Sequence, residues 1–295
     1  GVGILNAGAT VGGMTTPVIG LMIAGVYGWQ AAFLATGAIG FVVLAGWLLM
    51  YRQPEDHPRV TAAERAWIEQ DGEDTTGKVL GWRQAIRQRQ AWYFICGKFF
   101  TDPVWYLFLF WLPDFFVKTQ GPDLFPKGQE GIFATIGPAL IGVYLLADIG
   151  SIMGGWLSCH FIKRGWSINR ARKTTLFLAA LCAVPLLFGL QVGNPLIVVL
   201  IIGFGTAGHQ AFSSNIFTMI SDLYPRRAVA TVAGMGGAAG ALGGILIAQA
   251  TGWTLELTGS YWPLLIYAGL AYLIAFTVIH LLVPRMEPAP VAPLE

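Results

Sequence analysis

The sequence alternates between long apolar stretches and shorter segments that hold most of its charged residues. A helix needs about 20 predominantly apolar residues to cross the roughly 30 Å hydrocarbon core of a bilayer. Eight stretches meet that length, at approximately 3 to 25, 30 to 51, 92 to 117, 133 to 158, 174 to 191, 196 to 220, 228 to 252 and 262 to 284. They lack the alternation of transmembrane β-strands, so the sequence predicts an all-α, polytopic membrane protein with eight spans. The shortest span, 174 to 191, is interrupted by Pro185.

Basic residues are concentrated in alternate connections. Fifteen of the 18 lysines and arginines lie in connections on one side of the predicted membrane, at 52 to 91, at 159 to 173, at Arg226 and Arg227, and at Arg285. The opposite side holds only Lys118 and Lys127. Because cytoplasmic connections are enriched in Lys and Arg, we expect both ends of the chain on the cytoplasmic side. Adding or removing one span would scatter the basic segments over both faces.

Composition agrees with a membrane protein and excludes a soluble one. Hydrophobic residues make up 55% of the chain and charged residues only 12%, whereas soluble domains average about 25% charged residues. The three cysteines, Cys96, Cys159 and Cys182, lie in or at the ends of apolar stretches, and we interpret them as buried apolar residues. We expect a lipid bilayer around the chain, and neither a metal, a cofactor nor a nucleic-acid partner.

The order of the segments suggests a division into two unequal parts. The chain starts at Gly1 directly on an apolar run, without a signal peptide, so we expect it to begin inside a membrane helix. Two predicted spans (1 to 51) precede a soluble loop (52 to 91), and six spans (92 to 284) precede a cytoplasmic tail (285 to 295). This order suggests a remnant of one half of a two-half transporter followed by a complete second half.

Within the soluble loop, Thr61 is followed three residues later by Glu64. This spacing is the capping box, in which each side chain bonds the other residue's backbone N–H. We therefore expect a short surface helix to begin there.

Seven segments carry irregular polar and aromatic patterns that hydropathy alone does not explain. They are NAGATVGGMTTP (6 to 17), GWQAAFLATGAIGF (28 to 41), YRQPEDHPRVTAAERAWI (51 to 68), KFFTDPVWYLFLFWLPDF (98 to 115), ADIGSIMGGWLS (147 to 158), GHQAFSSNIFTMISDLYPRRAV (208 to 229) and GMGGAAGALGGILIAQATGW (234 to 253). In these segments the chain resembles the major facilitator superfamily, and within it the hexuronate transporters of the anion:cation symporter family. One departure is Cys159, where many members of the superfamily have an Asp that belongs to a gating motif.

The resemblance implies a fold and an activity. The predicted spans would be helices five to twelve of a twelve-helix transporter. The protein would be a proton-coupled symporter that carries a hexuronate, such as galacturonate or glucuronate, across a bacterial inner membrane by alternating access, as a monomer when full length. The alternative within the family is another organic anion, such as an aldonate, an aldarate or an aromatic acid.

Among the ionisable residues inside predicted spans, four are candidates for a functional role: Lys98, Asp102, Asp148 and His209. Each costs roughly 2.5 to 3.5 kcal/mol on insertion scales, so each needs a compensating role. Lys98 and Asp102 are neighbours on one helix face, either as a buried pair or as groups that contact a substrate carboxylate or a proton. Asp148 is a candidate partner in a cytoplasmic gate, or bonds a neighbouring helix. His209 is either a proton carrier or a hydrogen-bonded packing residue.

The segment from 208 to 215 holds more polar groups than packing needs, namely His209, Gln210, Ser213, Ser214 and Asn215. Such side chains recognise the hydroxyls of a sugar acid, although bonds between helices would use the same groups. Trp105 and Tyr106 could stack on the apolar face of a sugar. These residues, with Lys98 and Asp102, are the candidate substrate site.

Glycines recur at spacings that allow helices to approach closely. They are Gly8 and Gly12, Gly150 and Gly154, and Gly236, Gly240 and Gly244. The resemblance places their helices at the seam between two halves, where these faces would slide; static packing is the alternative. Asp148, and Asp222 and Arg226 in the SDLYPRR segment, are further candidates for this interface or its gate.

Other classes of protein fit the sequence less well. An intramembrane enzyme would need a nucleophile or metal motif, and neither HExxH nor GxSxG occurs. A sensor would need a larger soluble domain than the 52 to 91 loop. ATP-driven transport would need a GxxxxGK[ST] loop, which the sequence also lacks. We therefore expect a secondary transporter.

Overall fold

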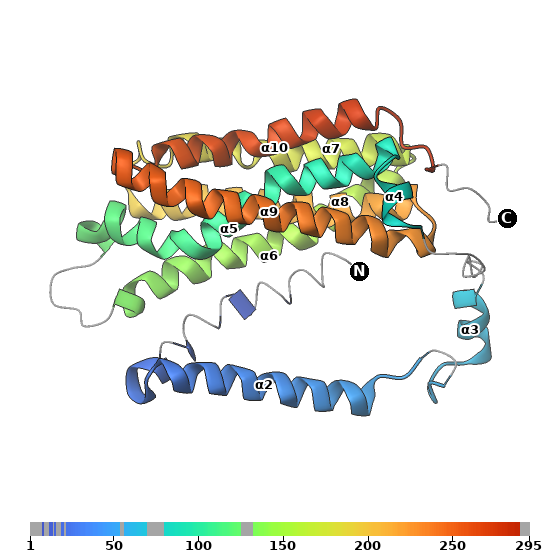
Figure 1. Cartoon of the computed structure of the whole chain (residues 1–295), viewed down its shortest axis with the longest axis horizontal. Coiled ribbons are helices and arrows are strands. Elements are labelled where there is room, and N and C mark those ends of the chain that lie inside the picture. The colour runs from blue at the N-terminus through green and yellow to red at the C-terminus, as the bar shows by residue number, and fades with distance from the viewer. Residues whose placement is uncertain are drawn as a thin grey trace. The chain divides into compact units, whose positions relative to one another are not determined.

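The computed structural model describes residues 8, 12, 13, 15, 19 and 20 and the ranges 22 to 53, 56 to 69, 80 to 124 and 132 to 289 (Figure 1). The described chain is helical and contains no strand. The chain divides into two compact units, one of residues 15 to 78 and one of residues 1 to 14 with 79 to 295. Most of the first predicted span, 3 to 25, lies outside the described residues.

The smaller unit contains helices α2 (Trp29–Met50) and α3 (Ala62–Glu69). Gly28 precedes α2 with φ of 84°, a conformation that favours glycine. Before α3, the backbone N–H of Glu64 donates to Thr61 Oγ1 at 3.2 Å and that of Thr61 donates to Glu64 Oε2 at 3.0 Å, so the predicted capping box is confirmed. The bonds from Thr61 lower the pKa of Glu64, and the cap is therefore lost as pH falls through that lowered value.

The larger unit is a helical bundle. Its elements are α4 (Trp82–Ala85), α5 (Arg89–Leu124), α6 (Ile132–Lys163), α7 (Ile168–Leu181), the 3-10 helix η1 (Val184–Phe188), α8 (Pro195–Leu223), α9 (Arg226–Thr258) and α10 (Trp262–Leu282). The long helices run side by side (Figure 1), with α5 packed along α9 and α10, and α6 along α8. Helices α5, α7 and α9 begin at one end of the bundle, and α6, α8 and α10 terminate there. We call it the basic end.

Helix limits follow signals in the sequence. Asn194 Oδ1 accepts the backbone N–H of Leu196 at 2.9 Å, and Pro195 begins α8. Gly259 ends α9 in the left-handed conformation at φ of 64°. The interruption predicted at Pro185 is present, because α7 stops at Leu181 and η1 follows.

Six described helical segments are long and apolar enough to cross a membrane, which indicates a multi-pass membrane protein. They are Trp29–Met50, Gly137–Lys163, Ile168–Phe188, Pro195–Leu223, Arg226–Thr258 and Trp262–Leu282. The 36-residue α5 has the length but is less apolar, since it carries Lys98, Asp102, Asp114 and Lys118. The count of eight spans, and their equivalence to helices five to twelve, stay predictions.

Glycines allow two close helix contacts inside the larger unit. A Cβ added at Gly154 would lie 2.6 Å from Ala211 Cα on α8, and Gly150 faces Ala207 in the same way. On α9, Gly236 and Gly240 face Phe94 and Asp102 of α5.

These four glycine faces are covered within one unit, so static packing describes them in this conformation. By contrast, a Cβ added at Gly8 or Gly12 would meet no atom within 4 Å. The three cysteines are free. Cys159 is exposed, so the expectation of burial is wrong for it, and Cys96 and Cys182 are only partly buried.

A C-terminal strap, residues 283 to 289, crosses the basic end of the bundle. Lys173 Nζ donates to the Pro284 carbonyl at 2.6 Å, and the backbone N–H of Ala289 donates to the Leu223 carbonyl at 2.8 Å. Val283 and Ala289 are buried. The strap therefore binds the second turn of α7 and the last turn of α8.

Candidate functional site

A cavity of about 260 Å³ lies between polar faces of α5 and α8. Its lining residues are Lys98, Asp102, Trp105 and Tyr106 from α5, and His209, Gln210, Ser213 and Phe217 from α8. The spacing of three to four residues places each set on one face of its helix. Seven of the nine residues that the sequence suggested for a substrate site line this one cavity.

Lys98 and Asp102 form an ion pair within the cavity wall. Lys98 Nζ lies 2.6 Å from Asp102 Oδ1, and the two side chains are only 10% and 14% exposed. Nζ also lies 5.0 Å from the ring centroid of Phe217. The pair neutralises two charges that would be costly in a membrane, yet it borders the cavity, so Lys98 can also meet an anion there.

His209 is held by aromatic side chains from two helices. Its Nδ1 lies 2.8 Å from the Tyr272 hydroxyl, and its ring stacks on Trp105 with centroids 4.9 Å apart and planes 11° apart. Tyr272, on α10, is fully buried. Sequence reasoning missed Tyr272, because a tyrosine inside an apolar span gives no signal of its partner 63 residues away.

Ser214 and Asn215 do not line the cavity. Asn215 Nδ2 donates to the carbonyls of Gly154 and Ala211, each at 2.9 Å, which joins α8 to α6. Ser214 Oγ donates to the Ala211 carbonyl at 3.0 Å. For Asn215 the structure therefore favours the alternative of a bond between helices, whereas the printed bond of Ser214 lies within α8.

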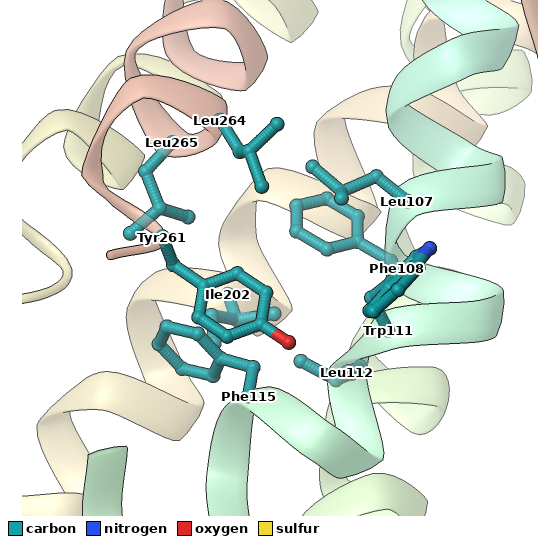
Figure 2. Close-up of a pocket in the computed structure, with 9 residues that line it drawn as sticks. All are labelled: Leu107, Phe108, Trp111, Leu112, Phe115, Ile202, Tyr261, Leu264 and Leu265. Atoms are coloured by element: carbon teal, nitrogen blue, oxygen red, sulfur yellow. The ribbon is translucent and has the colours of Figure 1, made fainter. Parts of the chain in front are cut away.

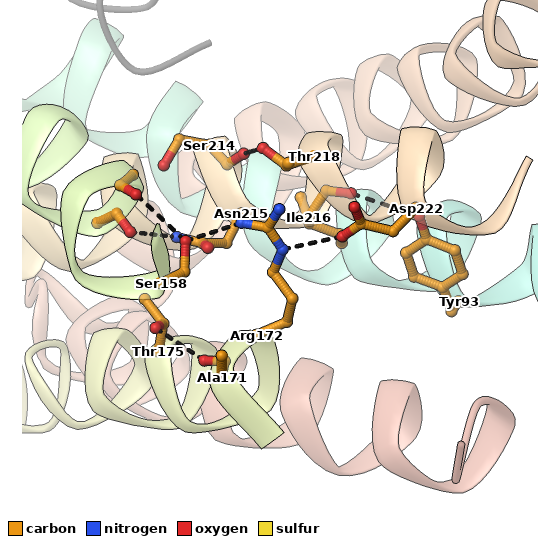
Figure 3. Close-up of polar contacts among 12 residues, drawn as sticks. Tyr93, Ser158, Ala171, Arg172, Thr175, Ser214, Asn215, Ile216, Thr218 and Asp222 are labelled. Atoms are coloured by element: carbon orange, nitrogen blue, oxygen red, sulfur yellow. Dashed lines mark hydrogen bonds and ion pairs between the residues drawn. The ribbon is translucent and has the colours of Figure 1, made fainter. Parts of the chain in front are cut away.

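A second polar cluster lies at the basic end (Figure 3). Arg172 Nε donates to Asp222 Oδ2 at 2.9 Å, and its Nη1 donates to Ser158 Oγ at 2.8 Å. This cluster joins α6, α7 and α8 through one buried guanidinium. Asp222 was a candidate from the sequence, whereas Arg172 was counted only as a basic residue of its loop. Ser158 directly precedes Cys159. Cys159 is the residue noted above as a departure from the family pattern.

The other gate candidates take different places. Asp148 is buried on α6, and Arg226 is exposed in the first turn of α9. Within the described ranges, no three His, Cys, Asp or Glu side chains gather as a metal site would require.

Arg172→Gln is expected to destabilise the bundle, because it leaves Asp222 and Ser158 without their buried cation. Removing one partner of a buried pair costs roughly 3 to 5 kcal/mol. Lys118→Gln is the matched control, since Lys118 pairs with Asp114 at 2.9 Å but is 57% exposed, and exposed pairs contribute at most about 1 kcal/mol. Thermal unfolding in detergent measures both. If both variants lowered the unfolding temperature by the same small amount, the Arg172 cluster would not stabilise the packing of α6, α7 and α8.

Away from the basic end, an apolar pocket of only about 10 Å³ lies between α5, α8 and α10 (Figure 2). Its lining includes Trp111 and Phe115 from α5, Ile202 from α8, and Tyr261, whose hydroxyl donates to Asp114 Oδ2. Side chains fill the space between these helices, so this part of the bundle is closed around an apolar core.

Comparison with known proteins places these features in a family context. A sequence model described as Major Facilitator Superfamily matches residues 1 to 248. The "Hexuronate transporter" of Escherichia coli (strain K12) is 31% identical over 265 residues, which cover 88% of this chain and 59% of the relative. The "Galacturonate transporter" of Dickeya chrysanthemi is 32% identical over 190 residues, covering 62% and 52%.

A further relative is a "Probable galactarate/D-glucarate transporter" of Escherichia coli (strain K12), 28% identical over 262 residues that cover 84% of this chain and 57% of the relative. The chain thus spans less than two thirds of the length of each of these relatives.

Proposed function

The chain belongs to the major facilitator superfamily, and from that premise we propose that it contributes one wall of the substrate site of a proton-coupled hexuronate symporter. The symporter would work by alternating access in a bacterial inner membrane, as a monomer with both ends of this chain on the cytoplasmic side. Transport is the proposed activity, not enzymatic conversion. The relatives named for hexuronate and galacturonate transport support this choice of substrate class.

The single observation that carries the proposal is the chemistry of the cavity. Lys98 supplies a cation for a carboxylate, and Gln210, Ser213 and Tyr106 supply groups that bond hydroxyls. Trp105 also lines the cavity, with the His209 imidazole stacked on its ring, and adds apolar surface for a sugar. The cavity has a volume of about 260 Å³, close to the roughly 300 Å³ of the smallest typical ligand pockets. That size suits a small sugar acid.

Proton coupling is proposed from the family resemblance, and the energetics of anion uptake are compatible with it. A monoanion that enters a negatively charged cell interior opposes the membrane potential by about 2.3 kcal/mol per 100 mV. One accompanying proton cancels that charge. Asp102 lines the cavity and is this chain's candidate for a group that exchanges a proton with substrate binding.

Uptake of a panel of labelled acids by the full-length protein in proteoliposomes tests the proposal. We expect saturable uptake of galacturonate or glucuronate that a proton gradient accelerates and that an uncoupler abolishes. An aldonate and an aromatic acid are the competitors. An uptake rate that does not depend on the proton gradient would contradict proton symport. Preference for an aromatic acid would contradict the sugar-acid assignment.

An aldarate is the second candidate substrate. The probable galactarate/D-glucarate transporter is 28% identical over most of this chain. An aldarate carries a carboxylate at both ends, so a hexuronate site should bind it more weakly unless a second cation is supplied by another part of the protein. Competition by galactarate at concentrations below those of galacturonate would favour this alternative.

A further inference from the structure

The Tyr272 hydroxyl is buried in the interior of the bundle and must find an acceptor there. Tyr272 is fully buried, and in the described part of the chain its only hydrogen-bond contact is His209 Nδ1, at 2.8 Å. Its ring otherwise meets Phe212 at 5.7 Å, edge to face, which provides no comparable acceptor. Because a buried hydroxyl without an acceptor is costly, the proton of Tyr272 is expected to point at Nδ1.

We infer that Tyr272 is a positioning residue that holds His209 as a neutral imidazole with its proton on Nε2. A neutral imidazole has one donor and one acceptor nitrogen. If Nδ1 carried the proton, the Tyr272 hydroxyl would have to accept it and would lose its own acceptor. With Tyr272 donating, Nδ1 accepts and Nε2 carries the hydrogen.

The orientation of the ring is fixed as well as its tautomer. Trp105 stacks on the imidazole with planes 11° apart, while Tyr272 meets the ring edge-on with planes 76° apart. A half-turn of the ring about the Cβ–Cγ bond would put Cδ2 in the place of Nδ1 and break the bond to Tyr272. His209 therefore presents one defined edge, and it is one of the residues that line the cavity.

Within the described residues, the surroundings of His209 leave no unpaired negative charge to stabilise a protonated imidazole. Lys98 and Asp102 line the same cavity, and their ion pair at 2.6 Å balances both charges. Tyr272 on α10, Trp105 on α5 and Tyr144 on α6, which lies edge-on to Trp105, are uncharged aromatic neighbours. Because the Asp102 carboxylate is paired with Lys98, it does not also pair with a protonated His209.

The consequence for recognition rests on the proposed function. His209 and Lys98 both line this cavity, and with the proton on Nε2 each of them carries an N–H donor. Together they match a group with several acceptor oxygens, which on a sugar acid is the carboxylate. Tyr272, which does not line the cavity, would therefore act on substrate affinity through His209.

Tyr272→Phe tests this chain of contacts, since it keeps the ring and removes only the donor. Losing the fixed tautomer should raise KM for the sugar acid about tenfold, as expected for one hydrogen bond to a charged group. Vmax should change little. The matched control is Tyr267→Phe on the same helix. The Tyr267 hydroxyl donates to the Phe100 carbonyl at 2.9 Å, and Tyr267 lines a different, apolar cavity, so its KM should stay unchanged.

A second variant separates positioning from packing. In His209→Gln the carboxamide reaches the position of Nε2 and offers an N–H donor that does not depend on a tautomer. Adding Tyr272→Phe to this background should change KM by less than about twofold, because the two effects are coupled. Equal effects of Tyr272→Phe in both backgrounds would overturn the inference.

The tautomer itself can be observed by nitrogen NMR of histidine-labelled full-length protein in lipid. The signal of His209 is the one that disappears in His209→Gln. We expect a neutral ring with the proton on Nε2, and a change of this signal in Tyr272→Phe. A proton on Nδ1, or an imidazolium, would overturn the inference even if uptake is normal. The expected tautomer without sugar-acid uptake would instead refute the proposed function alone.

Discussion

The double variant Lys98→Met with Asp102→Asn is expected to fold but to lose sugar-acid uptake. Both side chains keep their approximate size, and the buried pair is replaced without leaving a lone charge. Such replacements are often neutral for stability, whereas removing one partner costs roughly 3 to 5 kcal/mol. Loss of the cation that meets the substrate carboxylate should reduce uptake by roughly 10- to 100-fold, since a charged hydrogen bond contributes about 1.5 to 3 kcal/mol.

The single variants are the controls for this result. Lys98→Met leaves the Asp102 carboxylate unpaired, and Asp102→Asn leaves the Lys98 ammonium unpaired, so both should unfold at lower temperature than the double variant. Initial uptake rates in proteoliposomes and thermal unfolding in detergent are the two measurements. If the double variant transports as well as the parent protein, Lys98 is a structural partner only and the assignment of the carboxylate site is wrong.

Gly154→Ala is expected to separate α6 from α8 and to abolish transport. The added Cβ would lie 2.6 Å from both Cα and Cβ of Ala211, and backbone atoms cannot move aside as a flexible side chain can. Overpacking of this kind typically costs about 1 to 3 kcal/mol. The same displacement would lengthen the bond from Asn215 Nδ2 to the Gly154 carbonyl, now 2.9 Å. We therefore expect a lowered unfolding temperature as well as lost uptake.

Gly155→Ala provides the matched control on the next residue. A Cβ there meets no atom within 4 Å, and alanine favours a helix by up to about 1 kcal/mol over glycine. Its thermal stability should be equal to that of the parent protein or slightly higher. A Gly154→Ala variant as stable as Gly155→Ala would show that the two helices can adjust their separation at this crossing.

The helices were predictable because hydropathy and capping act within a few residues. Pro185 marked the change from α7 to η1, and Thr61 with Glu64 marked the start of α3. The pairing of Lys98 with Asp102 was also open to inference, because residues four apart meet on one helix. Each of these features depends on local spacing alone.

Contacts between helices were beyond the sequence, because a periodic pattern does not fix how one helix is rotated against another. Asn215 looked equivalent to Gln210, yet it bonds Gly154 on α6 while Gln210 lines the cavity. Tyr272 gave no signal until α10 was placed beside α8. The role of the site residues in transport stays a prediction.

The C-terminal strap has a practical consequence for work with this protein. Ala289 contributes a backbone hydrogen bond to Leu223, and Lys173 holds the strap at Pro284. Both contacts adjoin Arg172 and Asp222 in sequence, so shortening the chain here would disturb that cluster too. A purification tag or fluorescent reporter should accordingly be fused beyond Ala289, with a spacer that leaves these seven residues free to stay docked.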